Sequence, residues 1–389
     1  MVHAQLTFFD GAMTSDTPIA IGFESAPVVL AGEKANLAYN AVCGTRAGEY
    51  PDPDLSAVDS VTAACLDVVR AVAPEQLAHA EPVARTSALW TAHAFPHLRL
   101  DTPSMIASTM LNTALFLHDD GVDDARWAHD PSAAERVRAL DELNATILRA
   151  FRSDRSPDVD PGDAGDPGDA GDPDQPRLKV VFGLLREVIA LYCAHLPRWH
   201  ARKGVFIGFL KEYFDACEWY ARELAASATW PVDRTTFLFQ REFLGAGNMM
   251  FELAALLGDV DVPPDRQDLL EVRRFRQAAT YAAVWGNDVM GLERDIEGGG
   301  PCNLALILHG EGGLTLQEAC TEVMARQNRE GLEVLRLAEY LDDRYPDLKG
   351  YTRAVRTVLE GNFRAFPLTP RYRLRAGPRI RGVRTGTPR

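Results

Sequence analysis

The chain has 389 residues, of which 46% are hydrophobic and 25% charged, and its formal net charge at pH 7 is −14. This charge argues against a nucleic-acid partner, because phosphate backbones are bound by basic faces. No apolar run approaches the roughly 20 residues that span a bilayer, so we expect no membrane insertion.

Residues 1–50 are weakly periodic and are expected to be a poorly structured segment. From Leu55 onward helical periodicity dominates, and strand-like alternation is scarce. About ten helices predict an all-α fold, with one large helical bundle over residues 51–373. The stretches that we expect to be helical are Leu55–Val72, Met105–Asp124, Ala133–Phe151, Leu178–His195, Phe206–Ala226, Thr235–Leu257, Leu269–Arg294, Leu316–Leu341 and Thr352–Phe363.

Two segments differ from this pattern. Residues 156–176 contain two consecutive copies of Asp-Pro-Gly-Asp-Ala-Gly. Such a tract has nothing to bury, so it predicts a disordered surface insertion that does not separate two domains. Residues 374–389 form a basic tail that we also expect to be disordered.

The cysteines and the N-terminus indicate a cellular location. Six cysteines are scattered along the chain without a Cys-x-x-Cys pair, and the first residues do not read as a signal peptide. This usage favours a reduced cytoplasmic protein.

The first acidic cluster, Asp119-Asp120-x-x-Asp123, ends an apolar helical run. In a helix, Asp119 and Asp123 would lie on one face, where their charges repel each other. Mg²⁺, which prefers oxygen ligands, would be a natural counter-ion. The alternative is a solvated acidic helix end.

A second polar cluster lies in a later helical stretch. Asn287, Gly291 and Asp295 are spaced by four residues, so they would form one stripe about 12 Å long. Amide and carboxylate oxygens on such a stripe can bind a hard cation. We expect this stripe to face the first cluster across a cavity, although a plain polar helix face would have the same spacing.

Positive charge is supplied at two further positions. Arg241 lies in an otherwise apolar helical stretch, one turn before Gly245 and Gly247, which weaken the helix there. Arg371-Tyr372 follows the last expected helix. By themselves, these residues could equally be a salt-bridged arginine and a surface turn.

The order and spacing of these four elements resemble those of bacterial class I terpene synthases, over roughly Ala88 to Arg373. In that family an Asp-rich motif precedes a diphosphate-sensing Arg, a second metal motif and an Arg-Tyr pair. Here 46 residues separate Arg241 from Asn287, and 84 separate Asn287 from Arg371.

The second motif departs from the family pattern Asn-Asp-x-x-Ser-x-x-x-Glu. Gly291 stands in place of the Ser and offers no side-chain ligand, and Asp295 stands in place of the Glu with a shorter reach. The resemblance also places Gly245 where the family has its effector carbonyl, after Leu244 in the linker position.

The resemblance implies a fold and a chemistry. The fold would be the α-helical class I terpenoid synthase bundle. Three Mg²⁺ ions, held by Asp119, Asp123, Asn287 and Asp295, would neutralise the diphosphate of a linear prenyl substrate. The resemblance implies further site residues. Asp120 would be a catalytic residue of the first motif, Arg241, Arg371 and Tyr372 would bind the diphosphate, and Phe116 and Trp285 would face the carbocation.

The expected activity is that of a lyase which cyclises farnesyl or geranylgeranyl diphosphate to a sesquiterpene or diterpene. Two alternatives remain open, a prenyl-chain-elongating synthase and a catalytically dead helical protein that binds diphosphate. The chain could also form a homodimer, as helical bundles of this kind often do.

Overall fold

The computed structural model describes residues 5–14, 17–25, 27–44, 52–122, 133–153, 175–226, 233–298, 302–369, 371–372 and 379–386. The insertion expected at 156–176 lies almost entirely outside these ranges. Asp123 of the first acidic cluster also lies outside these ranges.

The chain forms two compact units. The first comprises Met1–Asp52, Ala92–His97 and Trp230–Arg389, and the second comprises Pro53–Thr91 and Leu98–Thr229. The single helical domain expected over residues 51–373 stays a prediction.

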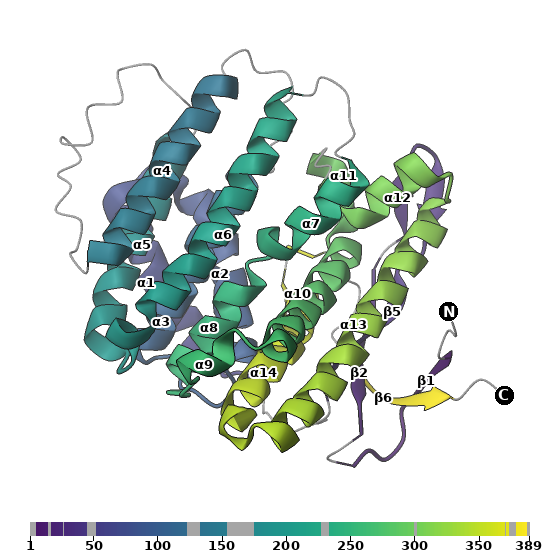
Figure 1. Cartoon of the computed structure of the whole chain (residues 1–389). Helices are drawn as coiled ribbons and strands as arrows, with labels where there is room; N and C mark the ends of the chain where they lie inside the picture. The colour runs from purple at the N-terminus through teal and green to yellow at the C-terminus, as the bar shows by residue number, and fades with distance from the viewer. Residues whose placement is uncertain are drawn as a thin grey trace. The chain divides into compact units, whose positions relative to one another are not determined.

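The second unit is helical throughout its described part. Packing of α3 against α5 and of α4 against α6 forms its frame, and α4 and α6 lie side by side in Figure 1. Its core includes Phe151, Tyr192, Trp199 and Phe206, whose rings pack with centroids between 5.3 and 6.3 Å apart. The elements are α1 (Leu55–Val72), η1 (Pro74–Gln76), α2 (Leu77–Ala94), whose last residues belong to the first unit, α3 (Pro103–Val122), α4 (Ala133–Ser153), α5 (Gln175–His195) and α6 (Trp199–Ala226).

The first unit is built around the long antiparallel pair α10 and α13, with α14 packed against both. Its helices are α7 (Arg234–Leu244), α8 (Gly247–Leu257), α9 (Pro264–Gln267), α10 (Leu270–Met290), α11 (Leu292–Gly298), α12 (Leu304–Gly312), α13 (Leu316–Arg344), η3 (Pro346–Leu348), α14 (Lys349–Ala365) and η4 (Phe366–Leu368).

The first unit also contains strands, which corrects the expectation of weak structure at both chain ends. Four of them form an antiparallel sheet in the order β1-β6-β2-β5. Strand β6 lies in the basic tail, and its partners come from the opposite end of the chain, so no local pattern could reveal the pairing. The strands are β1 (Gln5–Phe9), β2 (Ile19–Glu24), β3 (Val28–Leu30), β4 (Glu33–Ala35), β5 (Ala38–Gly44) and β6 (Arg379–Gly386).

Strand β5 lies directly on α13. The backbone N–H of Val42 donates to Asn328 Oδ1 at 2.9 Å, and Gln327 Nε2 donates to the Val42 carbonyl at 2.8 Å. A Cβ at Gly331 would come within 2.3 Å of the same carbonyl oxygen. The strand can therefore approach this closely only because position 331 is a glycine.

The all-α prediction is confirmed, and the terminal sheet is an addition to it. The expected stretch Thr235–Leu257 divides into α7 and α8, and Leu269–Arg294 divides at Gly291. The list of expected helices lacked α2, which has Pro82 in its interior, and the two short helices α9 and α12, of four and nine residues.

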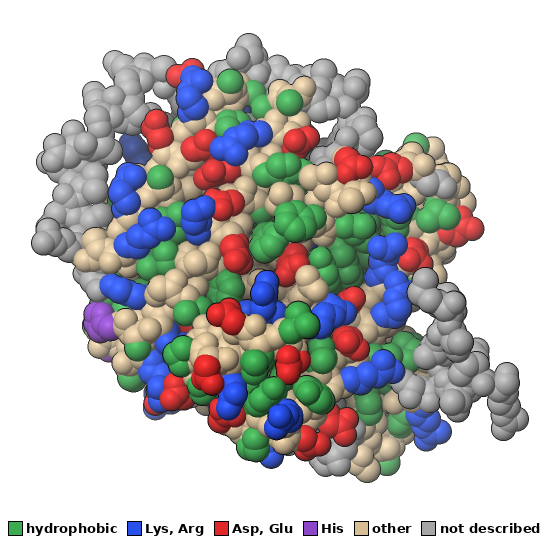
Figure 2. All heavy atoms as spheres, viewed as in Figure 1, with side chains coloured by type: hydrophobic (Ala, Val, Ile, Leu, Met, Phe, Trp, Pro, Cys, Tyr) green, Lys and Arg blue, Asp and Glu red, His purple; other side chains and the backbone are tan. Residues whose placement is uncertain are grey.

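Two surface properties follow from the described residues. No helix among them combines the length and the apolar character that a membrane span requires. On the face drawn in Figure 2, acidic and basic side chains are interspersed over the described part of the surface.

Candidate active site

The first acidic cluster forms the end of α3, which continues to Val122. Asp119 and Asp120 are half-buried there, as is Phe116 one turn earlier. A Cβ at Gly121 would lie 3.5 Å from Arg177 Nη1 on α5, so a cation stands next to this helix end. Arg177 was not among the residues singled out from the sequence.

A buried histidine fixes the turn that carries these carboxylates. His118 Nε2 lies 3.0 Å from Asn144 Oδ1, and Asn144 Nδ2 donates to Glu218 Oε1 at 2.9 Å. Burial lowers the pKa of His118 to about 4, so the ring is neutral at pH 7. Because the Asn144 oxygen can only accept, Nε2 carries the proton and donates to it.

The second cluster lies where α10 ends and α11 begins. The expected continuous helix is interrupted at Gly291, the C-cap of α10, so the stripe is not a single helix face. Two backbone hydrogen bonds preserve its spacing: Gly291 N–H donates to the Asn287 carbonyl at 2.7 Å, and Asp295 N–H donates to the Gly291 carbonyl at 3.0 Å.

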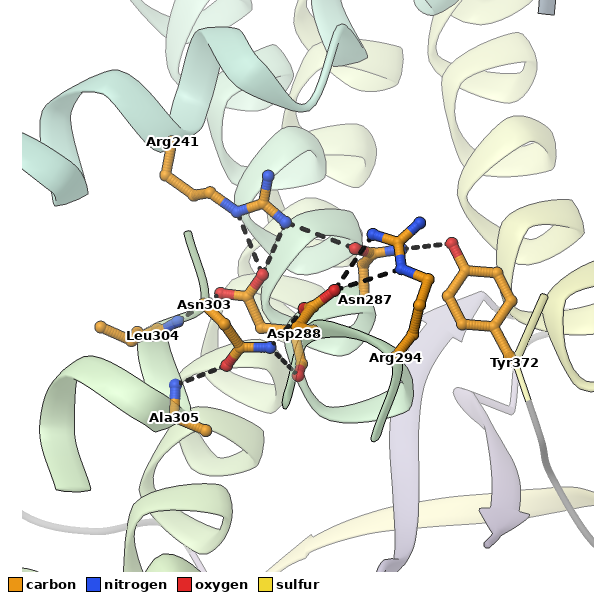
Figure 3. A network of polar contacts seen from close by, with 9 residues as sticks. Arg241, Asn287, Asp288, Arg294, Asn303, Leu304, Ala305 and Tyr372 are labelled. Carbon is orange, nitrogen blue, oxygen red and sulfur yellow. Dashed lines mark hydrogen bonds and ion pairs between the residues drawn. The ribbon is translucent and has the colours of Figure 1, made fainter. Parts of the chain in front are cut away.

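Arg241, near the end of α7, contacts both residues at the start of this cluster (Figure 3). Its Nε and Nη2 donate to Asp288 Oδ1 at 3.1 and 2.6 Å, and Nη2 also donates to Asn287 Oδ1 at 3.3 Å. Two residues that the family resemblance had singled out, Arg241 and Asn287, are therefore in contact. Asp288 was not among the residues singled out from the sequence.

Asp288 is the most deeply buried charge of the site, with a side chain only 1% exposed. Burial raises its pKa to about 6, and Arg241 and the Leu304 backbone N–H, which both favour the carboxylate, offset only part of this effect. At pH 7 and above, Asp288 is therefore ionised and holds the Arg241 guanidinium.

Tyr372 joins the same network from beyond the last helix. Asn287 Nδ2 donates to the Tyr372 hydroxyl at 2.7 Å, and the tyrosine ring packs on Phe366 with centroids 4.4 Å apart. Burial raises the pKa of this hydroxyl, which keeps it protonated. Arg371, the neighbouring residue, is half-buried.

Asp295 is partnered on both carboxylate oxygens. Arg294 donates to Oδ1 from Nε and Nη2 at 3.2 and 3.1 Å, and Asn303 Nδ2 donates to Oδ2 at 2.8 Å. Neither Arg294 nor Asn303 had been assigned a role from the sequence. Only the N-cap pattern of an Asn before the apolar run at Leu304 could have pointed to Asn303.

The helix break near Arg241 is present, but its glycines act differently than expected. The residue with the left-handed backbone is Ala246, at φ 51°. A Cβ at Gly245 would come within 2.2 Å of Val284 Cγ1, and one at Gly247 within 2.4 Å of Thr280 Oγ1. The two glycines therefore allow close packing against α10, and this packing places α7 over the second cluster.

The two aromatic candidates have different surroundings. Trp285 is buried and stacks on Tyr281, with centroids 5.3 Å apart and nearly parallel planes. One face of the indole is therefore already covered. Phe116 keeps part of its surface accessible.

The donor atoms of both clusters are oxygens, which suits Mg²⁺ better than a softer metal. Among the described residues, no group of three or more His, Cys, Asp or Glu side chains could hold a metal ion. A Cβ at Gly291 would lie 3.6 Å from Asp295 Oδ2, so the missing side chain leaves space next to a carboxylate oxygen. By donor type, the oxygen atoms of these residues suit a hard cation, whose remaining ligands would be water or substrate oxygens.

Comparison with known proteins agrees with this geometry. The family model "Terpene synthase family 2, C-terminal metal binding" matches residues 110–330, more than half of the chain. This all-α chain is a class I terpene synthase, a lyase. It belongs to terpene synthase family 2.

Individual relatives are distant. Terpene synthase 3 of Physarum polycephalum is 24% identical over 66% of this chain and 67% of its own length. The (+)-T-muurolol synthase of Roseiflexus castenholzii is 29% identical over 32% of this chain. The match spans only 38% of that protein, and a match to the germacrene A synthase of Nostoc punctiforme spans 49% of that one.

Solved structures show the same fold. The linalool/nerolidol synthase of Streptomyces clavuligerus aligns with a TM-score of 0.57 at 21% identity, covering 82% of this chain and 98% of that one. The germacradien-4-ol synthase of Streptomyces citricolor aligns with a TM-score of 0.56 at 17% identity, covering 84% and 98%. The predicted class I terpenoid synthase fold is confirmed.

Proposed function

We propose that this enzyme is a Mg²⁺-dependent terpene cyclase that ionises a linear prenyl diphosphate and cyclises the resulting carbocation. The observation that carries the proposal is the network of Arg241, Asn287 and Tyr372. It brings together three residues from distant parts of the sequence. The family resemblance assigns Asn287 to the metal ions and Arg241 and Tyr372 to the diphosphate.

Asp119 and Asp123 on one motif, and Asn287 and Asp295 on the other, would hold Mg²⁺. The bound ions would stabilise the negative charge of the departing diphosphate. Water would supply the ligand that Gly291 lacks. We keep three ions as the proposed number.

The remaining site residues act on the diphosphate and on the carbocation. Arg241 and Arg371 would contact phosphate oxygens, for which a planar guanidinium is suited, and Tyr372 would donate its hydroxyl. Asp288 keeps Arg241 oriented, and the Gly245 carbonyl would take the effector position. The rings of Phe116 and Trp285 would stabilise positive charge by about 0.5–2 kcal/mol each.

Farnesyl and geranylgeranyl diphosphate are the proposed substrates, which would give a sesquiterpene or a diterpene. The name of the Roseiflexus relative describes it as cyclising (2E,6E)-farnesyl diphosphate, which favours the C15 substrate. A cytoplasmic location and a homodimer remain proposals.

The test is incubation with geranyl, farnesyl or geranylgeranyl diphosphate and Mg²⁺, each with and without isopentenyl diphosphate. Mass spectrometry of the organic extract should show a cyclic product that needs no isopentenyl diphosphate. Asp119→Ala should abolish this product, because it removes a proposed metal ligand. A product that requires isopentenyl diphosphate would instead indicate a chain-elongating synthase, and binding without turnover would indicate a catalytically dead binding protein.

A further inference from the structure

The first turn of α12 contacts the two carboxylates of the second cluster. Asn303, its N-cap residue, is completely buried and uses its whole side-chain amide (Figure 3). Nδ2 donates to Asp295 Oδ2 at 2.8 Å and to the Asp288 carbonyl at 2.6 Å, and Oδ1 accepts from the Ala305 backbone N–H at 2.9 Å. The next residue, Leu304, donates its backbone N–H to Asp288 Oδ2 at 3.0 Å.

These contacts fix which way the amide points. Oδ1 accepts the capping hydrogen bond from the helix, so Nδ2, with its two hydrogens, must face Asp295 and the Asp288 carbonyl. A reversed amide would place an oxygen against two acceptors and would leave the Ala305 N–H facing a donor. One residue thus caps α12 and holds the Asp295 carboxylate.

We infer that Asn303 is a positioning residue that orients the Asp295 carboxylate for binding of a divalent cation. The inference rests on the proposed function. Gly291 supplies no side-chain ligand, so cation binding at this motif depends strongly on the orientation of Asp295. Asp295 is also one methylene shorter than the Glu usual in the family. The shorter side chain of Asp295 can therefore reach the cation from fewer backbone positions than a Glu could.

Asn303→Ser separates the two roles of this residue. Serine is a good N-cap, so α12 keeps its first turn, but its short hydroxyl cannot replace the amide donor that reaches Asp295. The matched control is Thr315→Ala, which removes the N-cap of α13 and its capping box without touching the site. It lowers stability through loss of a helix cap alone.

The measurement is the melting temperature of each purified full-length protein as Mg²⁺ is titrated at a fixed concentration of inorganic diphosphate. The Mg²⁺ concentration that gives half of the maximal stabilisation should rise about tenfold in Asn303→Ser, since loss of a residue that orients a metal ligand typically costs 10–100-fold in affinity. It should stay at the wild-type value in Thr315→Ala, although that protein melts at a lower temperature.

The possible outcomes separate the two claims. A wild-type protein that does not respond to Mg²⁺ and diphosphate overturns the proposed function. A normal wild-type response with an unchanged Mg²⁺ requirement in Asn303→Ser overturns the role of Asn303. If the serine variant does not fold, Asn303→Asp is measured in its place. Aspartate keeps the helix cap, but it replaces the amide donor that faces Asp295 with an acceptor oxygen. An unchanged or lowered Mg²⁺ requirement in that variant contradicts the inference.

Discussion

Gly291 leaves a small space among residues that we assign to the metal and diphosphate site. A Cβ there would lie 3.6 Å from Asp295 Oδ2, 3.5 Å from Tyr372 Cε1 and 3.1 Å from the Asn287 carbonyl oxygen. The backbone at φ −85° is compatible with any L-residue. A small side chain therefore fits after a slight adjustment, and its polar atom would stand beside the carboxylate.

We predict that Gly291→Ser lowers the Mg²⁺ concentration required for half-maximal activity several-fold, because the hydroxyl adds an oxygen ligand. Activity measured across a Mg²⁺ titration would check this. Gly291→Ala fills the same space without a ligand, and Gly298→Ser adds a hydroxyl where a Cβ would meet no atom within 4 Å. An equal effect in either of these two controls would contradict the interpretation.

His93 shows how burial links a residue outside the site to the pH dependence of stability. Burial and the nearby Arg364 lower the pKa of His93 to about 4, against a weaker opposing effect from Asp52. Nε2 is buried without a hydrogen-bond partner. The unfolded chain therefore binds a proton at a higher pH than the folded chain does, and stability falls as pH drops from about 6.5 to about 4.

Between pH 7 and pH 4 the free energy of unfolding of the wild type should fall, partly because of His93. We predict that this fall is about 3 kcal/mol smaller in His93→Leu, as expected from the pKa difference. Urea unfolding at several pH values would measure this. The control is the replacement by leucine of His195, an exposed residue at the end of α5. Identical profiles for His93→Leu and the wild type would refute the prediction. Buried His118 should retain part of the acid sensitivity in every variant.

At the scale of elements, the terminal sheet and the helices approach each other closely at Gly331. Strand β5 passes over α13 there, and Gln327 and Asn328 bind both backbone groups of Val42. The strand cannot move away from a new side chain without breaking these two hydrogen bonds. Position 331 therefore couples the sheet to α13.

Gly331→Ala should lower the free energy of unfolding by about 2–3 kcal/mol, because overpacking at a rigid contact forces the backbone to shift. Chemical denaturation would measure the change. Gly208→Ala on α6, where a Cβ meets nothing within 4 Å, should be neutral or slightly stabilising, since alanine favours helix. A Gly331→Ala protein as stable as the Gly208→Ala protein would show that the sheet does not resist displacement.

Most helices could be predicted because their signal is local. Apolar residues recur with helical spacing along α1, α4, α13 and α14, and α1 begins and ends where the periodicity indicates. The interruption at Gly291 and the role of the glycines beside Ala246 were not predictable. They depend on what packs against the chain at those points.

For the whole molecule, the family model and the terminal sheet concern different parts of the chain. The family model covers residues 110–330, whereas β1, β2, β5 and β6 lie outside that range. The sheet joins the two chain ends, and its apolar contacts combine Ala20, Val42 and Val383 with Leu332 and Leu335 of α13. Strand β6 follows the Arg371-Tyr372 pair in sequence, so the sheet anchors the chain beyond a proposed diphosphate-binding element.

The sequence by itself indicated the helical class and the family, and it singled out Arg241, Asn287 and Tyr372 as candidate site residues. Helical periodicity is local, and the spacing of Arg241, Asn287 and Tyr372 carries the family pattern. Only the tertiary structure decided the partners of these residues, namely Asp288 for Arg241, Asn303 for Asp295, and the opposite chain end for β6. Those choices depend on burial and on contacts between distant segments, which no local pattern encodes.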